Sequence, residues 1–158
     1  MVRRRLAFVG LIANLTVGLS IGLAPPAAAQ VTPGETSPAE VSPADRMAIR
    51  ETIQAQVDAF RRDDGEAAFG FASPTIQGLF GTPDLFMQMV RQGYRPVYRP
   101  QVFEFREIVT LHGLVTQKVH VVGPDGRPVT AYYPMSQGPD GRWRIEGCYL
   151  QAPDEHQA

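Results

Sequence analysis

The spacing of apolar residues divides the chain into a helical first half and a strand-rich second half. Apolar side chains recur every three or four residues at Ile49, Ile53, Val57 and Phe60. This is the spacing of one face of an α-helix. Ser42 before Pro43 is typical of a helix start, and Asp63-Asp64-Gly65 interrupts the pattern. We therefore expect a helix of about five turns that turns this face to the core.

Two or three shorter helices are expected before residue 94. One segment covers residues 66–72, and the Ser73-Pro74 and Thr82-Pro83 pairs each supply a cap and a proline suited to a first helical turn. The last pattern stops at Gly93. The stretch 94–100 contains Tyr-Arg-Pro twice, and each proline favours an extended conformation at the residue before it. We expect no continuous helix there.

From Gln101 onward the apolar period changes to two, which predicts strands. Four strands are expected, over residues 102–109, 114–122, 128–135 and 143–150. Turns separate them at His112-Gly113 and at two copies of Gly-Pro-Asp-Gly-Arg, which we interpret as similar hairpin turns. Helices followed by an antiparallel meander predict an α+β domain, with the N-terminal helices packed on the four-stranded sheet.

The first 29 residues have the pattern of a removable signal peptide. Arg3 to Arg5 form a positive start, residues 6–23 carry no charge, and Ala27 to Ala29 supply a cleavage site. We expect a cut after Ala29 and a periplasmic or secreted protein without a stable membrane span. An uncleaved anchor is the alternative, although the apolar stretch is shorter than the about 20 residues that span a bilayer. The arginines also suit twin-arginine export, so that route and the Sec route stay open.

Composition predicts the domain boundaries of the chain, and its net charge bears on its partners. Residues 30–42 are rich in proline, threonine and serine, which predicts a flexible linker. We expect residues 43–152 to form a single domain and residues 153–158 to form a C-terminal tail. The leader holds three of the 15 basic residues and no acidic one, which leaves 12 basic against 16 acidic side chains. A net charge of −4 argues against nucleic acid as a partner.

Cys148 is the single cysteine, so no internal disulfide is expected. Its position in a predicted strand favours a buried small side chain, with an intermolecular disulfide or a reactive thiol as alternatives. The strand acids Glu104, Glu107 and Glu146 alternate with apolar neighbours and are expected to face solvent. The three histidines share no ligand spacing. We therefore assign no catalytic residue, metal site or cofactor.

The segment 94–100 is the first candidate binding site. Tyr94, Arg95, Tyr98 and Arg99 present phenol rings and guanidinium groups that suit a carboxylate or phosphate ligand. The alternative is a rigid connector whose tyrosines pack on the core and whose arginines pair with Asp63, Asp64 or Glu104.

Strand aromatic residues form the second candidate. Tyr132 and Trp143, with Phe103, Phe105 and Tyr133, are placed to line a cavity for an apolar ligand, or alternatively form the core. Because Tyr132 and Tyr133 are adjacent in a strand, they point to opposite faces. One of them must leave the main core, which indicates a second buried surface, either a pocket or a dimer interface.

Motifs along residues 44–151 support a family resemblance. In the helical half they are Ala44-Asp45-Arg46 with Ile49 and Ile53, Ala59-Phe60-Arg61 with Asp63-Asp64, Ala68-Phe69, Phe71-Ala72-Ser73-Pro74, Ile76-Gln77, Phe80-Gly81-Thr82-Pro83, Met89-Val90 with Gly93-Tyr94, and Pro96-Val97-Tyr98-Arg99-Pro100. In the strand half they are Gly123-Pro124-Asp125-Gly126 and Trp143-Arg144-Ile145 with Gly147-Cys148. These segments resemble the bacterial family named domain of unknown function 4864. The order of elements is similar to that of the cystatin-like, nuclear-transport-factor-two-like (SnoaL-like) superfamily, which includes ketosteroid isomerase.

The resemblance implies a cone-like fold in which the meander is curved. It implies no activity, because a fold of this kind hosts both enzymes and binding modules. We expect a non-catalytic exported module that binds a small ligand or an envelope protein, with a homodimer through the sheet as a further possibility. The alternative is a small cofactor-free isomerase or hydratase of the SnoaL type.

Overall fold

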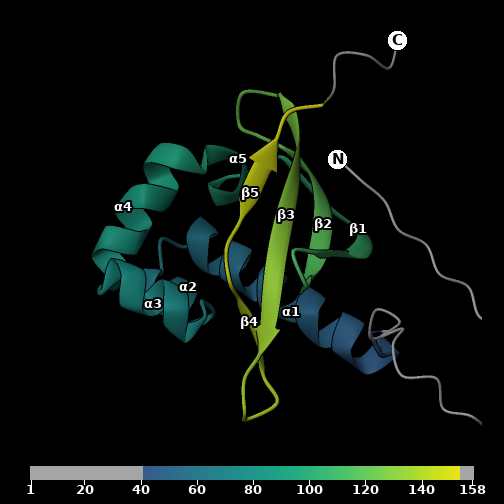
Figure 1. The fold of residues 1–158 in the computed structure, drawn as a ribbon. Helices are drawn as coiled ribbons and strands as arrows, with labels where there is room; N and C mark the ends of the chain where they lie inside the picture. Colours follow the sequence, from purple (N-terminus) through teal and green to yellow (C-terminus); the bar gives the residue numbers. More distant parts are fainter. Residues whose placement is uncertain (1–40, 154–158) are drawn as a thin grey trace, which may run out of the picture. The chain divides into compact units, whose positions relative to one another are not determined.

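Five helices precede five strands in residues 41–153, which are the part of the chain that the computed structural model describes (Figure 1). The helices are α1 (Pro43–Arg61), α2 (Gly65–Gly70), α3 (Pro74–Phe80), α4 (Pro83–Gly93) and α5 (Arg95–Tyr98). The strands are β1 (Val102–Leu111), β2 (Leu114–Val122), β3 (Pro128–Gln137), β4 (Trp143–Ile145) and β5 (Tyr149–Gln151). The α+β class is confirmed. The predicted signal peptide, nearly all of the linker and most of the tail lie outside the described residues.

The helix starts follow the predicted caps. The Ser42 hydroxyl accepts a hydrogen bond from the Asp45 amide at 3.1 Å, and Ser73 and Thr82 cap α3 and α4 in the same way. A proline occupies the first turn of each of these three helices, where its missing N–H has no helical partner. The same reason explains α5, a single turn around Pro96. Our expectation of an extended Arg95 is therefore wrong.

The strands form one antiparallel sheet in the order β1-β2-β3-β4, and β5 also pairs with β3. The single predicted strand 143–150 is thus two short strands. Met135 pairs with Ile145 and Tyr132 with Tyr149, so three residues of the last segment oppose two residues of β3. This is a β-bulge. It lies opposite Pro134, which has no N–H to donate to a regular ladder, although its carbonyl accepts from the Glu146 amide at 2.8 Å.

The hairpin turns match their prediction. In the two Gly-Pro-Asp-Gly-Arg segments, the amides of Gly126 and Gly141 each donate to the glycine carbonyl three residues earlier, at 3.0 and 2.9 Å. Both glycines have positive φ, at 77° and 75°. These turns require that conformation, which glycine adopts without a steric penalty.

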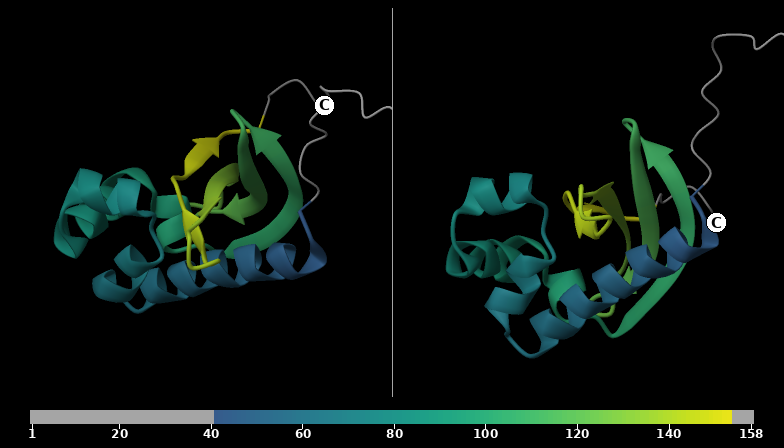
Figure 2. Two further views of the ribbon diagram at one scale, coloured as in Figure 1. Left: turned by 60° about the horizontal axis from the view of Figure 1, so that its bottom comes forward. Right: turned by 90° about the horizontal axis from the view of Figure 1, so that it is seen from below.

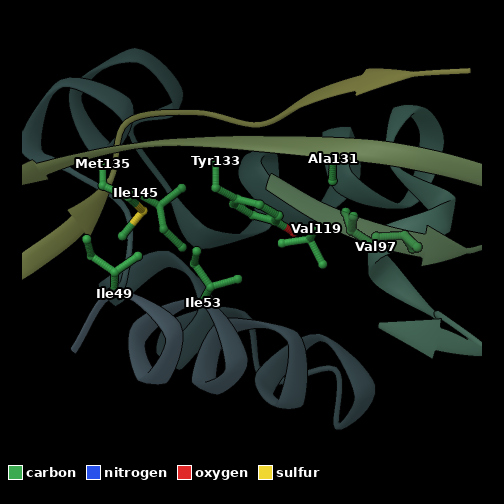
Figure 3. Packing of buried hydrophobic residues seen from close by; sticks show 9 residues of the cluster. Ile49, Ile53, Val97, Val119, Ala131, Tyr133, Met135 and Ile145 are labelled. Carbon is green, nitrogen blue, oxygen red and sulfur yellow. The ribbon is translucent and has the colours of Figure 1, made fainter. Parts of the chain in front are cut away.

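Helix α1 packs across one face of the curved sheet, and α2 to α4 gather to one side of it (Figure 2). The predicted apolar face of α1 is buried. Ile49 and Ile53 reach toward Tyr133, Met135 and Ile145 from the sheet (Figure 3). A second cluster joins the end of α1 to α2 and α4. No helix between residues 41 and 153 is long and apolar enough to cross a bilayer.

Candidate functional site

A pocket of about 310 Å³ lies between helices α3 and α4 and the bulged end of the sheet. Its wall is built from every layer of the domain and is mainly apolar. The lining residues are Gln56, Phe60, Ala72, Ile76, Leu79, Phe80, Phe86, Met89, Val90, Tyr94, Val97, Tyr133, Ile145, Glu146, Gly147, Cys148 and Tyr149. The size falls at the lower end of the range that is typical of small-molecule sites.

The short helix α3 closes one side of this pocket. Residues before it are anchored to β4: the Ser73 amide donates to the Ile145 carbonyl at 2.9 Å, and the Ile145 amide donates to Phe71 at 3.0 Å. The helix itself buries none of its residues fully. Leu79 remains 74% exposed at the pocket, although it is apolar.

Tyr133 lines the pocket and carries a buried polar group. Its residue is 1% exposed, and its hydroxyl has no hydrogen-bond partner of normal geometry among residues 41–153. The side chain runs along the inner face of the sheet toward Val119 and Val97, and Val97 also lines the pocket (Figure 3). An unpartnered buried hydroxyl costs about 1–3 kcal/mol. Burial also raises the pKa of Tyr133 well above its ordinary value, so the hydroxyl stays neutral and able to donate.

The bulge places Cys148 beside Tyr133. With one extra residue, the alternation of side chains changes phase, so Cys148 and Leu150 pack against the core while Tyr149 faces outward. Cys148 is half-buried and lines the pocket. Burial raises the pKa of the Cys148 thiol to about 12. Because the thiolate is the nucleophile, a raised pKa disfavours the reactive form near neutral pH, which argues against the reactive-thiol alternative.

The position of Glu146 differs from the one that the strand pattern predicted. The strand pattern predicted that it faces solvent, but it is half-buried, lines the pocket and accepts a hydrogen bond from the buried Ser73 hydroxyl at 2.9 Å. The cause is again the bulge, which interrupts regular alternation at this residue. Glu104 and Glu107 are exposed, as predicted.

The predicted site residues of the segment 94–100 divide into two groups. Tyr94 lines the pocket, whereas Tyr98 and Arg99 contact Asp63 at the end of α1. The Arg99 guanidinium lies 2.7 Å from the Asp63 carboxylate, and the Tyr98 hydroxyl donates to the same group. The Tyr98 hydrogen bond, with nearby Arg99, lowers the pKa of Asp63. Arg95 is exposed. The contacts at Asp63 are those expected if the segment 94–100 is a rigid connector whose arginines pair with acidic side chains of the same chain.

Tyr132 and Trp143 lie away from the pocket. Tyr132 is on the outer face of the sheet, where it stacks with Lys118 and, with Leu114 and Tyr149, borders a shallow hollow of about 470 Å³. The Trp143 indole N–H donates to Asp45 at the start of α1, at 2.9 Å. The structure therefore does not bring the six predicted ligand contacts together. The homodimer through the sheet stays a prediction.

Sequence reasoning missed Tyr133, Glu146 and Cys148 as neighbours in one pocket. The adjacent tyrosines indicated that the two strand faces differ, but did not indicate which face is hollow. A proline inside a predicted strand is a signal for a bulge, and Pro134 is that signal here. Within residues 41–153, no three acidic, histidine or cysteine side chains gather as metal ligands.

Comparisons with known proteins give a family and a distant structural likeness. A family model described as "Domain of unknown function (DUF4864)" matches residues 42–158. The crystal structure of an NTF-2-like protein of unknown function from Burkholderia xenovorans LB400 aligns with a TM-score of 0.43 and 20% sequence identity. That alignment covers 72% of this chain and 90% of the other. No curated protein matches the chain.

Proposed function

We propose that this chain, which belongs to the family described as domain of unknown function (DUF4864), binds a small, mainly apolar molecule in the pocket beside α3. The observation that carries the proposal is an apolar pocket of about 310 Å³ lined by Tyr133, a buried tyrosine whose hydroxyl has no hydrogen-bond partner among residues 41–153. Apolar pockets with a few polar groups are the usual form of a small-molecule site.

The mouth of the pocket supports the same function. Leu79 and Tyr149 line the pocket and are strongly exposed. Apolar surface beside a concave site often marks a place where a ligand is bound. A bound apolar molecule would cover part of these side chains, and the area removed from water would contribute about 25 cal/mol per Å².

Replacing Leu79 with aspartate is expected to weaken binding of an apolar probe, 2-ethylnaphthalene, about fivefold to tenfold. The change removes apolar contact at the mouth and adds a carboxylate that loses hydration when the probe binds. Because Leu79 is exposed, the fold should be unaffected. Isothermal titration calorimetry measures the dissociation constant.

Leu85→Asp is the matched control. Leu85 is also an exposed leucine, at 55%, but it does not line the pocket. Its replacement should leave the affinity unchanged. Equal weakening by both variants, or by neither, would contradict binding in this pocket.

We further propose that the chain is exported, with cleavage after Ala29, and works in the periplasm or outside the cell. The support is the charged start, the uncharged stretch and the small residues that end at Ala29. N-terminal sequencing of the protein purified from its host should begin at Gln30. A sequence that begins within the first five residues would contradict export with cleavage.

An isomerase or hydratase is the second candidate, because Glu146 and Tyr133 line the same pocket. A carboxylate and a phenol together can move a proton on a bound molecule. The Ser73 hydroxyl already bonds one oxygen of Glu146, which favours a positioning role for this carboxylate. A carbonyl probe recovered unchanged after long incubation supports binding alone, whereas Glu146-dependent conversion would establish the enzyme.

A further inference from the structure

We propose that the ligand of this pocket carries no anionic group and presents a neutral hydrogen-bond acceptor, such as a carbonyl oxygen, to the Tyr133 hydroxyl. This inference rests on the proposed function and names the chemical class of the ligand. It makes Tyr133 the residue that determines specificity.

The need for an acceptor follows from the surroundings of Tyr133. On the inner face of the sheet its neighbours include Val119, Ala131 and Met135, which offer no polar side-chain atom. Gln117 pairs with Tyr133 across β2 and is also fully buried, but its Oε1 is not within hydrogen-bond distance of the hydroxyl, and both atoms lack a partner among residues 41–153. The Cys148 thiol lies close enough to contribute to the raised pKa of Tyr133, but sulfur is a weak acceptor, and the geometry gives the hydroxyl no hydrogen-bond partner among residues 41–153. Buried polar groups in native proteins nearly always have a partner. A ligand atom in the adjoining pocket would be that partner.

The exclusion of anions follows from the charges around the pocket. Within residues 41–153, Glu146 is the one side chain with a formal charge that lines the pocket, and no lysine, arginine or histidine of this part of the chain lines it. The Gln56 side-chain amide donates one of its two N–H groups to the Ala68 carbonyl at 3.1 Å, and it carries no charge that would compensate an anion. A carboxylate ligand would therefore lose its hydration without a cationic partner and would face Glu146.

The positions of these groups also give the direction of the ligand. Tyr133 is fully buried at the inner wall, whereas Leu79 and Tyr149 are exposed at the mouth. The acceptor end therefore lies inside. The apolar body extends outward along Phe80 and Met89, which also line the pocket.

Three probes of nearly equal shape test this inference: 2-acetonaphthone, 2-ethylnaphthalene and 2-naphthoate. They present a ketone, a hydrocarbon and a carboxylate at the same position. Calorimetric titration measures each dissociation constant for the full protein and for Tyr133→Phe. We expect the preference for the ketone over the hydrocarbon to fall about tenfold in Tyr133→Phe, because one hydrogen bond is lost. The carboxylate should bind the unsubstituted protein at least tenfold more weakly than the ketone.

Tyr132→Phe is the matched control, since it removes the same hydroxyl from the neighbouring residue on the outer face of the sheet. It should change none of the three affinities. Tyr133→Phe removes an unpartnered hydroxyl, so it should fold and melt at or above the temperature of the unsubstituted protein.

The outcomes separate the inference from the proposed function. If the hydrocarbon binds but Tyr133→Phe leaves the preference unchanged, the choice of Tyr133 is wrong and the apolar pocket stands. Tight binding of the carboxylate would overturn the exclusion of anions. If none of the three probes binds, both the inference and the proposed function are contradicted.

Discussion

Replacing Ile53 with alanine is expected to lower the free energy of unfolding by about 3 kcal/mol. Ile53 is fully buried on the face of α1 that packs against the sheet, in the same cluster as Tyr133 and Ile145. Removing its outer carbons leaves a cavity that rigid neighbours on both layers cannot fill. Urea unfolding followed by the fluorescence of Trp143, the single tryptophan, measures the change.

Met47→Ala is the control for this prediction. Met47 lies on the same helix but is 63% exposed, so its replacement should change the free energy of unfolding by less than about 0.5 kcal/mol. Similar losses for the two variants would mean that α1 does not turn the predicted face to the sheet.

Between about pH 9 and pH 12 the free energy of unfolding is expected to fall steeply. Burial raises the pKa of Cys148 from 9.0 to about 12 and raises the pKa of Tyr133 well above 10.0. In this range the unfolded chain releases these protons while the folded chain keeps them. Folded protein then binds more protons than unfolded protein, so stability is complete below pH 9 and decreases as pH rises. Each such group contributes a slope of about 1.4 kcal/mol per pH unit.

Cys148→Ala separates the thiol from the other groups that titrate at high pH. Urea unfolding at pH 8, 9, 10 and 11 should show a shallower decrease for this variant, with the difference beginning near pH 9. If the free energy of unfolding fell equally with pH in the two proteins, Cys148 would be exposed to water in the folded state. It would then not form part of a buried inner wall of the pocket.

The helices were predictable because their signals are local. Ser42, Ser73 and Thr82 each precede a proline, and each caps the helix that the pattern predicted. The ends of β2 and the two repeated turns were predictable for the same reason, because their signals are local too. The division of residues 143–150 into β4 and β5 was not predictable from local signals, because it depends on Pro134 in the neighbouring strand.

The candidate site was less predictable for the same reason. Adjacent residues in a strand face opposite ways, so the sequence limited the choice to Tyr132 or Tyr133. Which of the two faces α1 is determined by pairing across the sheet. The place of Glu146 and Cys148 beside Tyr133 depends on the bulge and on residues 71–73, which precede α3 and contact Ile145 of β4.

The distinctive segment 94–100 illustrates the opposite difficulty. Its repeated Tyr-Arg-Pro units suggested an anion site, but Asp63 occupies the guanidinium of Arg99 and the hydroxyl of Tyr98. Asp63 is more than thirty residues away in sequence, at a positive φ of 56°. The sequence left Asp63, Asp64 and Glu104 as alternative partners of these arginines, and the choice of Asp63 depends on the placement of the end of α1 beside α5.

We propose that the pocket holds a ligand whose acceptor bonds the Tyr133 hydroxyl, and a crystal structure of the protein grown with 2-acetonaphthone would show this contact. We expect the naphthalene rings between α3 and α4, with the carbonyl oxygen within hydrogen-bond distance of the Tyr133 hydroxyl. A pocket filled by the protein's own side chains, with Tyr133 bonded to one of them, would contradict it.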